Sequence, residues 1–226
     1  MDSKIINEKI LEVFIECNIQ EFPINCFEIL QHYNFRLFTY DEIKLSDPEL
    51  FAIAKEYSDD AFKYKNIICY NNSKSESRIR FSLMHELGHF ILNHKNTTPD
   101  HEDEADYFAS CVLAPRAAIW RSGCRTAEDI HNMFGLSYSA SNRALVDFQK
   151  WRYGKIYDCE KELGDMLYSK KEPTDIQDQS IEKKYQNKKR WKEIEERNRF
   201  IEENICDLSE YALMQYERSL HLGHVL

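Results

Sequence analysis

The chain has 226 residues, of which 42% are hydrophobic, and a formal net charge of −9. This size allows one domain with a core and an appendage, or two small domains, and the acidic balance argues against nucleic acid or an anionic membrane as a partner. The seven cysteines form no Cys-x-x-Cys pair, which predicts free thiols in a reducing compartment. Because no apolar run could span a bilayer and the first residues do not form a signal peptide, we expect a cytoplasmic protein. Its many lysines, asparagines and isoleucines are typical of a low-GC bacterial genome.

The first seventy residues predict two helices and a small sheet. Amphipathic spacing favours a helix over 4–17, and a second helix should run from Pro23 to about Asn34. β-forming residues predict three strands, over 35–40, 50–57 and 64–70, with a turn at 58–60. We therefore expect an α+β fold that is mainly helical, with a mostly antiparallel sheet packed beside the helix that follows.

The helix expected to begin near Ser75 carries His85-Glu86-x-x-His89. Residues four apart share one helix face, so the two imidazoles can bind one Zn²⁺, and Glu86 can act as a base toward a water on the metal. The motif alone is weak evidence, since a surface helix can carry the same residues by chance. However, the other faces of this helix are largely apolar, and a metal would satisfy polar groups on a buried helix. Gly88 predicts the close approach of another backbone.

A third ligand is expected on the next helix, which begins with Thr98-Pro99-Asp100. One face of this helix carries Glu102, Ala105, Asp106 and Ala109, and the alanines would allow it to approach the first helix closely. We assign Glu102 as the third zinc ligand and Asp106 as the acceptor for the free N–H of a ligand histidine. Glu104 points elsewhere and is the alternative ligand, and an ordinary acidic first turn is the alternative role for Glu102.

The two motifs resemble those of the ImmA/IrrE-type zinc metallopeptidases over roughly the first two-thirds of the chain. The resemblance rests on Arg78-x-Arg80-Phe81-x-x-x-His85-Glu86-Leu87-Gly88-His89-Phe90 and on Glu102-x-x-Ala105-Asp106-x-Phe108-Ala109-x-x-x-Leu113-Ala114-Pro115. The family often has Asn where this chain has Asp106, and Met where it has Ala114, but neither is a presumed ligand. The resemblance implies that His85, His89 and Glu102 are ligands and that Glu86 is catalytic.

The same resemblance implies a zincin-like fold and a protein substrate, often a helix-turn-helix repressor that controls a mobile element or stress genes. The residues do not identify a second donor for the oxyanion, and Tyr107, Tyr138 and Arg143 are candidates only. Two histidines near the motifs have ordinary explanations. His94 should stabilise the end of the motif helix by its charge or face the site as a supporting group, and His101 should be a solvated residue of a first helical turn.

We place the boundary of the metallopeptidase domain at residue 156. Within 1–156, Thr126 to Asp129 begins a helix that should end at Gly135, and a further helix should run over 139–151. Residues 157–226 would form a charged, mainly helical extension, with a long helix over 181–205 and another from Asp207 to Leu220.

Two other functions compete with a zinc endopeptidase. The chain could be a zinc-binding regulatory or interaction protein without proteolysis, although an intact Glu86 argues against this alternative. The helix-turn-helix outline of 126–151 could bind DNA, but the acidic chain lacks the basic surface that DNA binding requires. Neither the oligomeric state nor the substrate can be predicted from the residues.

Overall fold

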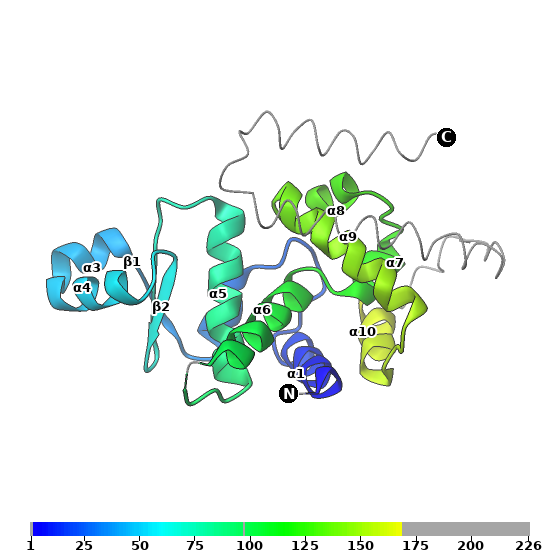
Figure 1. The fold of residues 1–226 in the computed structure, drawn as a ribbon, viewed down its shortest axis with the longest axis horizontal. Helices are drawn as coiled ribbons and strands as arrows, with labels where there is room; N and C mark the ends of the chain where they lie inside the picture. Colours follow the sequence, from blue (N-terminus) through cyan, green and yellow to red (C-terminus); the bar gives the residue numbers. More distant parts are fainter. Residues whose placement is uncertain (1, 97, 169–226) are drawn as a thin grey trace. The chain divides into compact units, whose positions relative to one another are not determined.

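The computed structural model describes residues 2–96 and 98–168. Strands β1–β3 all come before α5, and helices α5–α10 then follow without a strand between them in the described residues (Figure 1). In chain order the elements are α1 (Ser3–Glu16), α2 (Cys26–His32), β1 (Arg36–Thr39), α3 (Tyr40–Ser46), α4 (Pro48–Tyr57), β2 (Ala61–Tyr64), β3 (Ile67–Tyr70), α5 (Glu76–Ile91), α6 (Pro99–Leu113), α7 (Arg116–Ser122), α8 (Ala127–Phe134), α9 (Tyr138–Tyr153) and α10 (Asp158–Tyr168).

The sheet is mixed, with the strand order β1-β3-β2. β2 and β3 pair antiparallel across a tight turn at Lys65, which has a positive φ, whereas β1 and β3 pair parallel. The parallel pairing requires the chain to cross back between the two strands, and α3, α4 and β2 provide that crossing. The α+β class is therefore confirmed, but one of the two strand pairings is not antiparallel as expected.

The sheet lies between α5 and the α3–α4 pair (Figure 1). Adjacent residues of a strand point to opposite faces, and in β3 both are fully buried: Ile68 packs in the main core with Leu83 of α5, whereas Cys69 packs with Tyr40 and Ala54 of α3 and α4. The central strand is thus covered on both faces, and the main core lies on the α5 side.

The predicted strand over 50–57 is wrong, because these residues form most of α4. Asp47 caps this helix by accepting a hydrogen bond from the backbone N–H of Leu50, and Pro48 occupies its first turn. The apolar side chains that suggested a strand instead form one helical face, with Ala54 fully buried against the sheet. Helix α3 was also not predicted, although Thr39 and Glu42 form a capping box at its start.

Helices α5 and α6 pack closely along each other (Figure 1). Gly88 makes this possible, because a Cβ atom at this position would lie 3.2 Å from Ala105 Cα and 3.1 Å from Phe108 Cδ1. Ala105 and Ala109 are both fully buried. The prediction that small residues let these two helices approach is therefore confirmed.

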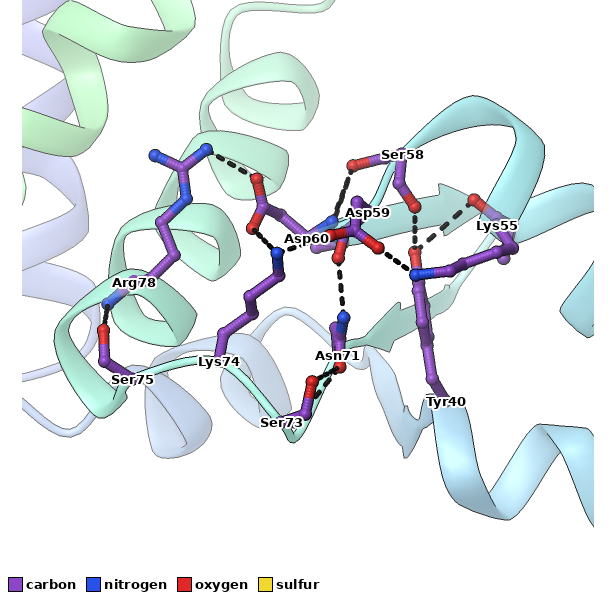
Figure 2. Close-up of polar contacts among 12 residues, drawn as sticks. Tyr40, Lys55, Ser58, Asp59, Asp60, Asn71, Ser73, Lys74, Ser75 and Arg78 are labelled. Carbon is purple, nitrogen blue, oxygen red and sulfur yellow. Dashed lines mark hydrogen bonds and ion pairs between the residues drawn. The ribbon is translucent and has the colours of Figure 1, made fainter. Parts of the chain in front are cut away.

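A polar network fixes the start of β2 against the start of α5 (Figure 2). Asp60 pairs with Arg78 at 2.5 Å and with Lys74 at 3.7 Å, and Asn71 donates a hydrogen bond to the Asp59 carbonyl at 2.8 Å. The Tyr40 hydroxyl, from α3, donates to the Ser58 carbonyl. These contacts join the sheet to the helix that carries the histidine motif.

Helices α8 and α9 form a packed pair joined at Gly135, which has a positive φ as expected for a helix end. The buried Arg80 of α5 donates hydrogen bonds to the carbonyls of Phe134 and Gly135, at 2.9 and 2.8 Å. The end of α8 is thus fastened to the motif helix. Helix α10 packs against α1 and α7. No described helix has the length and apolarity that crossing a membrane requires. The helices predicted over 181–205 and from Asp207 to Leu220 lie outside the described residues.

Candidate metal centre

Three predicted ligand side chains converge between α5 and α6. His85 Nε2 and His89 Nε2 lie 3.0 Å apart. The Glu102 carboxylate lies across both, with one oxygen 3.2 Å from His85 Nε2 and the other 3.2 Å from His89 Nε2. His85 and His89 come from successive turns of α5, and Glu102 comes from the first turn of α6, which Thr98 caps. The close packing at Gly88 brings these turns together.

Asp106 lies one turn after Glu102 on α6 and is bonded to His85, whose Nδ1 is 2.7 Å from Asp106 Oδ1. Burial alone would lower the pKa of His85, but the hydrogen bond to Asp106 and the negative charges of Asp106, Glu86 and Glu102 together outweigh it, so the pKa lies above its usual value. With its Nδ1 proton held by Asp106, His85 turns Nε2 toward His89 and Glu102. This is the contact that the sequence assigned to Asp106.

Glu86 lies in a poorly solvated environment next to the three converging side chains. Burial raises the pKa of its carboxyl to about 7, against the opposing positive charges of His85 and Lys63. The negative charge of Glu102 raises the pKa of Glu86 further. A carboxyl with a pKa near neutrality can both accept and release a proton under physiological conditions, as a general base must.

The three donor atoms fit a zinc ion. Two imidazole nitrogens with a carboxylate oxygen form a known donor set of catalytic zinc sites. With metal–ligand distances of about 2.0–2.1 Å, tetrahedral donor atoms lie about 3.3 Å apart, close to the 3.0 Å between the two Nε2 atoms and to the 3.2 Å between each Nε2 atom and its own oxygen of Glu102. Glu102 has 43% of its side chain exposed, against 17% for His85, so solvent can approach the centre from the Glu102 side.

A second group of the same composition lies behind His89 and was not predicted as a group. His94, His101 and Glu104 place one donor atom each within 4.8 Å of one another. His94 Nδ1 lies 2.9 Å from His89 Nδ1, and His94 Nε2 lies 3.0 Å from Glu104 Oε2. The ring of His101 stacks on that of His94, with centroids 4.2 Å apart. Glu104 thus faces His94, and the half-buried His101 stacks on the same ring.

The local backbone explains why the sequence did not reveal this group. Asn93 has a positive φ, which ends α5 and turns the chain back, so that the His94 N–H donates to the His89 carbonyl at 3.0 Å. His94 is brought against His89 by this turn and not by helical spacing. The signal available in the sequence was an asparagine directly after the helix, since asparagine tolerates this conformation.

Two of the candidate oxyanion donors have other contacts. The Tyr107 hydroxyl accepts a hydrogen bond from the Asn7 side chain of α1 at 3.1 Å, and the Tyr138 ring stacks on His131. Lys63 of β2, which we did not single out, adds positive charge at both Glu86 and His89. Lys63 lies here because residues 61–64 form the strand β2. The sequence had predicted a single strand over 64–70, which would have left Lys63 outside the sheet.

Comparison with known families gives a match over the middle of the chain. Residues 43–146 match the family model described as Peptidase_M78, IrrE N-terminal-like domain. The matched range contains both motifs, from α3 to α9, and begins after α1 and α2, so it is narrower than the resemblance that the sequence suggested. No curated protein and no solved structure gives a significant match.

Proposed function

We propose that this chain, whose residues 43–146 match the Peptidase_M78 model of an IrrE N-terminal-like domain, is a zinc-dependent metallo-endopeptidase that hydrolyses a peptide bond in a protein substrate. The convergence of His85, His89 and Glu102 carries the proposal. These three residues would hold the ion, and Asp106 would orient His85 by accepting its Nδ1 proton.

Each residue near the centre has a separate part in hydrolysis. Zinc, when bound, supplies a Lewis acid that lowers the pKa of a water molecule and polarises the scissile carbonyl. Glu86 removes a proton from the attacking water and passes it to the nitrogen of the leaving amine. Its poorly solvated position disfavours the charged form, which makes the carboxylate a stronger base toward that proton. Lys63 adds positive charge on the side of β2 and is a candidate to stabilise the oxyanion, in place of Tyr107 and Tyr138.

Strand β2 offers a binding surface for an extended substrate. Within the described residues it pairs only with β3, and α5 packs beside it (Figure 1). A peptide that adds to the unpaired edge of β2 would form backbone hydrogen bonds there, and these would hold one peptide bond near the centre. Binding through the backbone gives affinity with little dependence on sequence, so the side chains around the centre would select the cleavage site.

The substrate class that we favour is a helix-turn-helix repressor of a mobile element or a stress response. A repressor substrate places the peptidase in the compartment that holds the DNA, which is the cytoplasm if the chain is bacterial. The test is to incubate the zinc-loaded chain with the repressor encoded beside its own gene, with Glu86→Gln as the matched control. The wild type should cut the repressor, and Glu86→Gln should bind zinc equally but cut at least about 100-fold more slowly, since general base catalysis contributes 10²–10⁴-fold. Equal cleavage by both proteins would refute the role of Glu86.

The other two functions make different predictions in the same experiment. A zinc-dependent regulator would bind the repressor without cutting it, in both proteins. A DNA-binding protein would use α8 and α9, but Ile130 and Phe134 of α8 are fully buried, and Arg80 fastens the end of that helix to α5. These contacts support a packing role for the pair.

A further inference from the structure

We propose that His94 and Glu104 position His89 for metal binding by fixing which of its ring nitrogens carries the proton. The inference rests on the proposed zinc site, and it concerns two residues outside the three proposed ligands. The observation behind it is a continuous line of contacts from Glu104 through His94 to His89, with separations of 3.0 and 2.9 Å.

The positions of the protons follow from Glu104 inward. An ionised carboxylate can only accept hydrogen bonds, so the proton between His94 and Glu104 belongs to His94 Nε2. The His94 side chain is only 3% exposed, and such burial favours the neutral imidazole, which has a single proton. His94 Nδ1 is then an acceptor, and the contact at 2.9 Å must be donated by His89 Nδ1.

This arrangement prepares His89 as a ligand. With its proton on Nδ1, His89 has its lone pair on Nε2, the atom that lies 3.2 Å from Glu102 and 3.0 Å from His85 Nε2. If His94 Nδ1 instead donated the hydrogen bond to His89 Nδ1, the proton of His89 would lie on Nε2 and would block the metal. Asp106 does the same for His85, so each histidine of α5 has its own acceptor, a carboxylate for one and an imidazole for the other.

The same proton count argues against a second metal ion at His94, His101 and Glu104. A metal on His94 Nε2 would leave the His94 proton on Nδ1, facing His89 Nδ1. His89 would then have to accept there and to carry its own proton on Nε2. The two centres could therefore not both be filled by neutral histidines. His101 serves the arrangement differently, since it stacks on His94 while its Nδ1 lies 2.6 Å from the Asn96 carbonyl.

The first test observes the protons directly. Long-range ¹H–¹⁵N correlation spectra of the full chain without metal, with ¹⁵N-labelled histidine, distinguish the two neutral forms of each ring. We expect the Nε2–H form for His94 and the Nδ1–H form for His89. The opposite form at His89 would overturn the proposal. Because this measurement needs neither zinc nor cleavage, it does not depend on whether the chain is a peptidase.

The second test measures zinc affinity by competition with a chelator. His94→Phe retains a ring but removes the acceptor, so the zinc Kd should rise about 10–100-fold, as for other partners of ligand histidines. His94→Asn places an acceptor oxygen near the position of Nδ1 and should recover most of the affinity. Equal losses in both variants, with thermal unfolding to confirm that each is folded, would overturn the positioning role.

His101→Phe is the matched control, because it preserves the stacked ring and removes the nitrogen that a second metal would need. We expect wild type and His101→Phe each to bind one zinc ion per chain at this pair of helices. Their zinc Kd values should agree within about threefold, a smaller change than the one expected when a ligand histidine loses its hydrogen-bond partner. Two bound ions, one of which is lost in His101→Phe, would show that the group binds metal itself. A wild type that binds no zinc would instead refute the proposed function, while the proton positions could still be as inferred.

Discussion

Two groups of two histidines and one glutamate lie next to each other at α5 and α6, yet their environments differ. In the group of His85, His89 and Glu102, the Nδ1 atom of each histidine has a partner and the Nε2 atoms face the carboxylate, and the Glu102 side chain is 43% exposed. In the other group, His94 is 3% exposed, and both of its ring nitrogens lie within 3.0 Å of a partner.

The comparison teaches that residue types alone do not define a metal centre. Both groups bring three donor atoms within 4.8 Å of one another, but only the first leaves its nitrogen lone pairs directed at one point that solvent can approach. The second group instead supplies an acceptor to the first. Hydrogen bonds that fix proton positions thus give identical side chains different roles.

The strongest test of the different roles of the two groups is to make the same substitution in both. Glu102→Gln removes the charge of a proposed ligand, and the zinc affinity should fall by more than about 100-fold, beyond the range seen for outer partners. Glu104→Gln should weaken zinc binding only about 10-fold, because the amide oxygen can still accept from His94. Both affinities can be measured by competition with a chelator.

Each variant of this pair controls the other, because both exchange a carboxylate for an amide on the first turns of α6. Thermal unfolding without zinc should change little for Glu102→Gln, whose side chain is partly exposed. If the larger loss of zinc affinity belonged to Glu104→Gln, the roles that we give to the two groups would have to be exchanged.

A smaller effect is expected from Gly88→Ala, which tests the helix contact on which both groups depend. The new methyl group would lie 3.2 and 3.3 Å from backbone atoms of Ala105, which cannot rotate away as a side chain can. Overpacking of about 1–3 kcal/mol should exceed the gain of about 1 kcal/mol in helix propensity. We expect a lower melting temperature and, since α6 carries Glu102, weaker zinc binding. A more stable variant with unchanged zinc affinity would show that α6 is free to shift.

The sequence predicted the candidate site better than the sheet. His85 and His89 lie on one face because helical spacing requires it, and the start of α6 was marked by Thr98 and Pro99. The same kind of signal, Asp47 before Pro48, marks the start of α4, but the β-forming residues after it favour a strand. Capping signals should therefore outrank composition where the two disagree.

The remaining contacts could not be predicted because they depend on tertiary structure. Lys63 adds its charge to the centre only because β2 packs against α5. His94 meets His89 through a turn at Asn93, whose left-handed conformation asparagine permits but does not require. Local spacing determines which residues share an element, whereas the packing of elements determines which other side chains meet them.

The smallest expected effect tests whether the differences between the two groups are local. Asp60→Asn removes one charge from the network at the start of α5 (Figure 2), two helical turns before His85. The free energy of unfolding should fall by at most about 1 kcal/mol, as for other partly exposed ion pairs. Zinc affinity should stay within about twofold, because Asp60 acts on the centre only indirectly, through the charge interaction between Arg78 and Asp106.

The pH dependence of the stability lost in Asp60→Asn shows whether the lost charge causes it. The hydrogen bond from Arg78, against a smaller opposing effect of burial, holds the pKa of Asp60 below its ordinary value of 3.8. A lowered pKa in the folded state stabilises the protein fully above the unfolded value, and this contribution disappears as the pH falls through the folded value. The difference in unfolding free energy between wild type and Asp60→Asn should thus be constant near neutrality and shrink below pH 3.8. Glu56→Gln, at an exposed position of α4, is the matched control, and a difference for Asp60→Asn that persisted in acid would indicate lost packing instead of a lost charge.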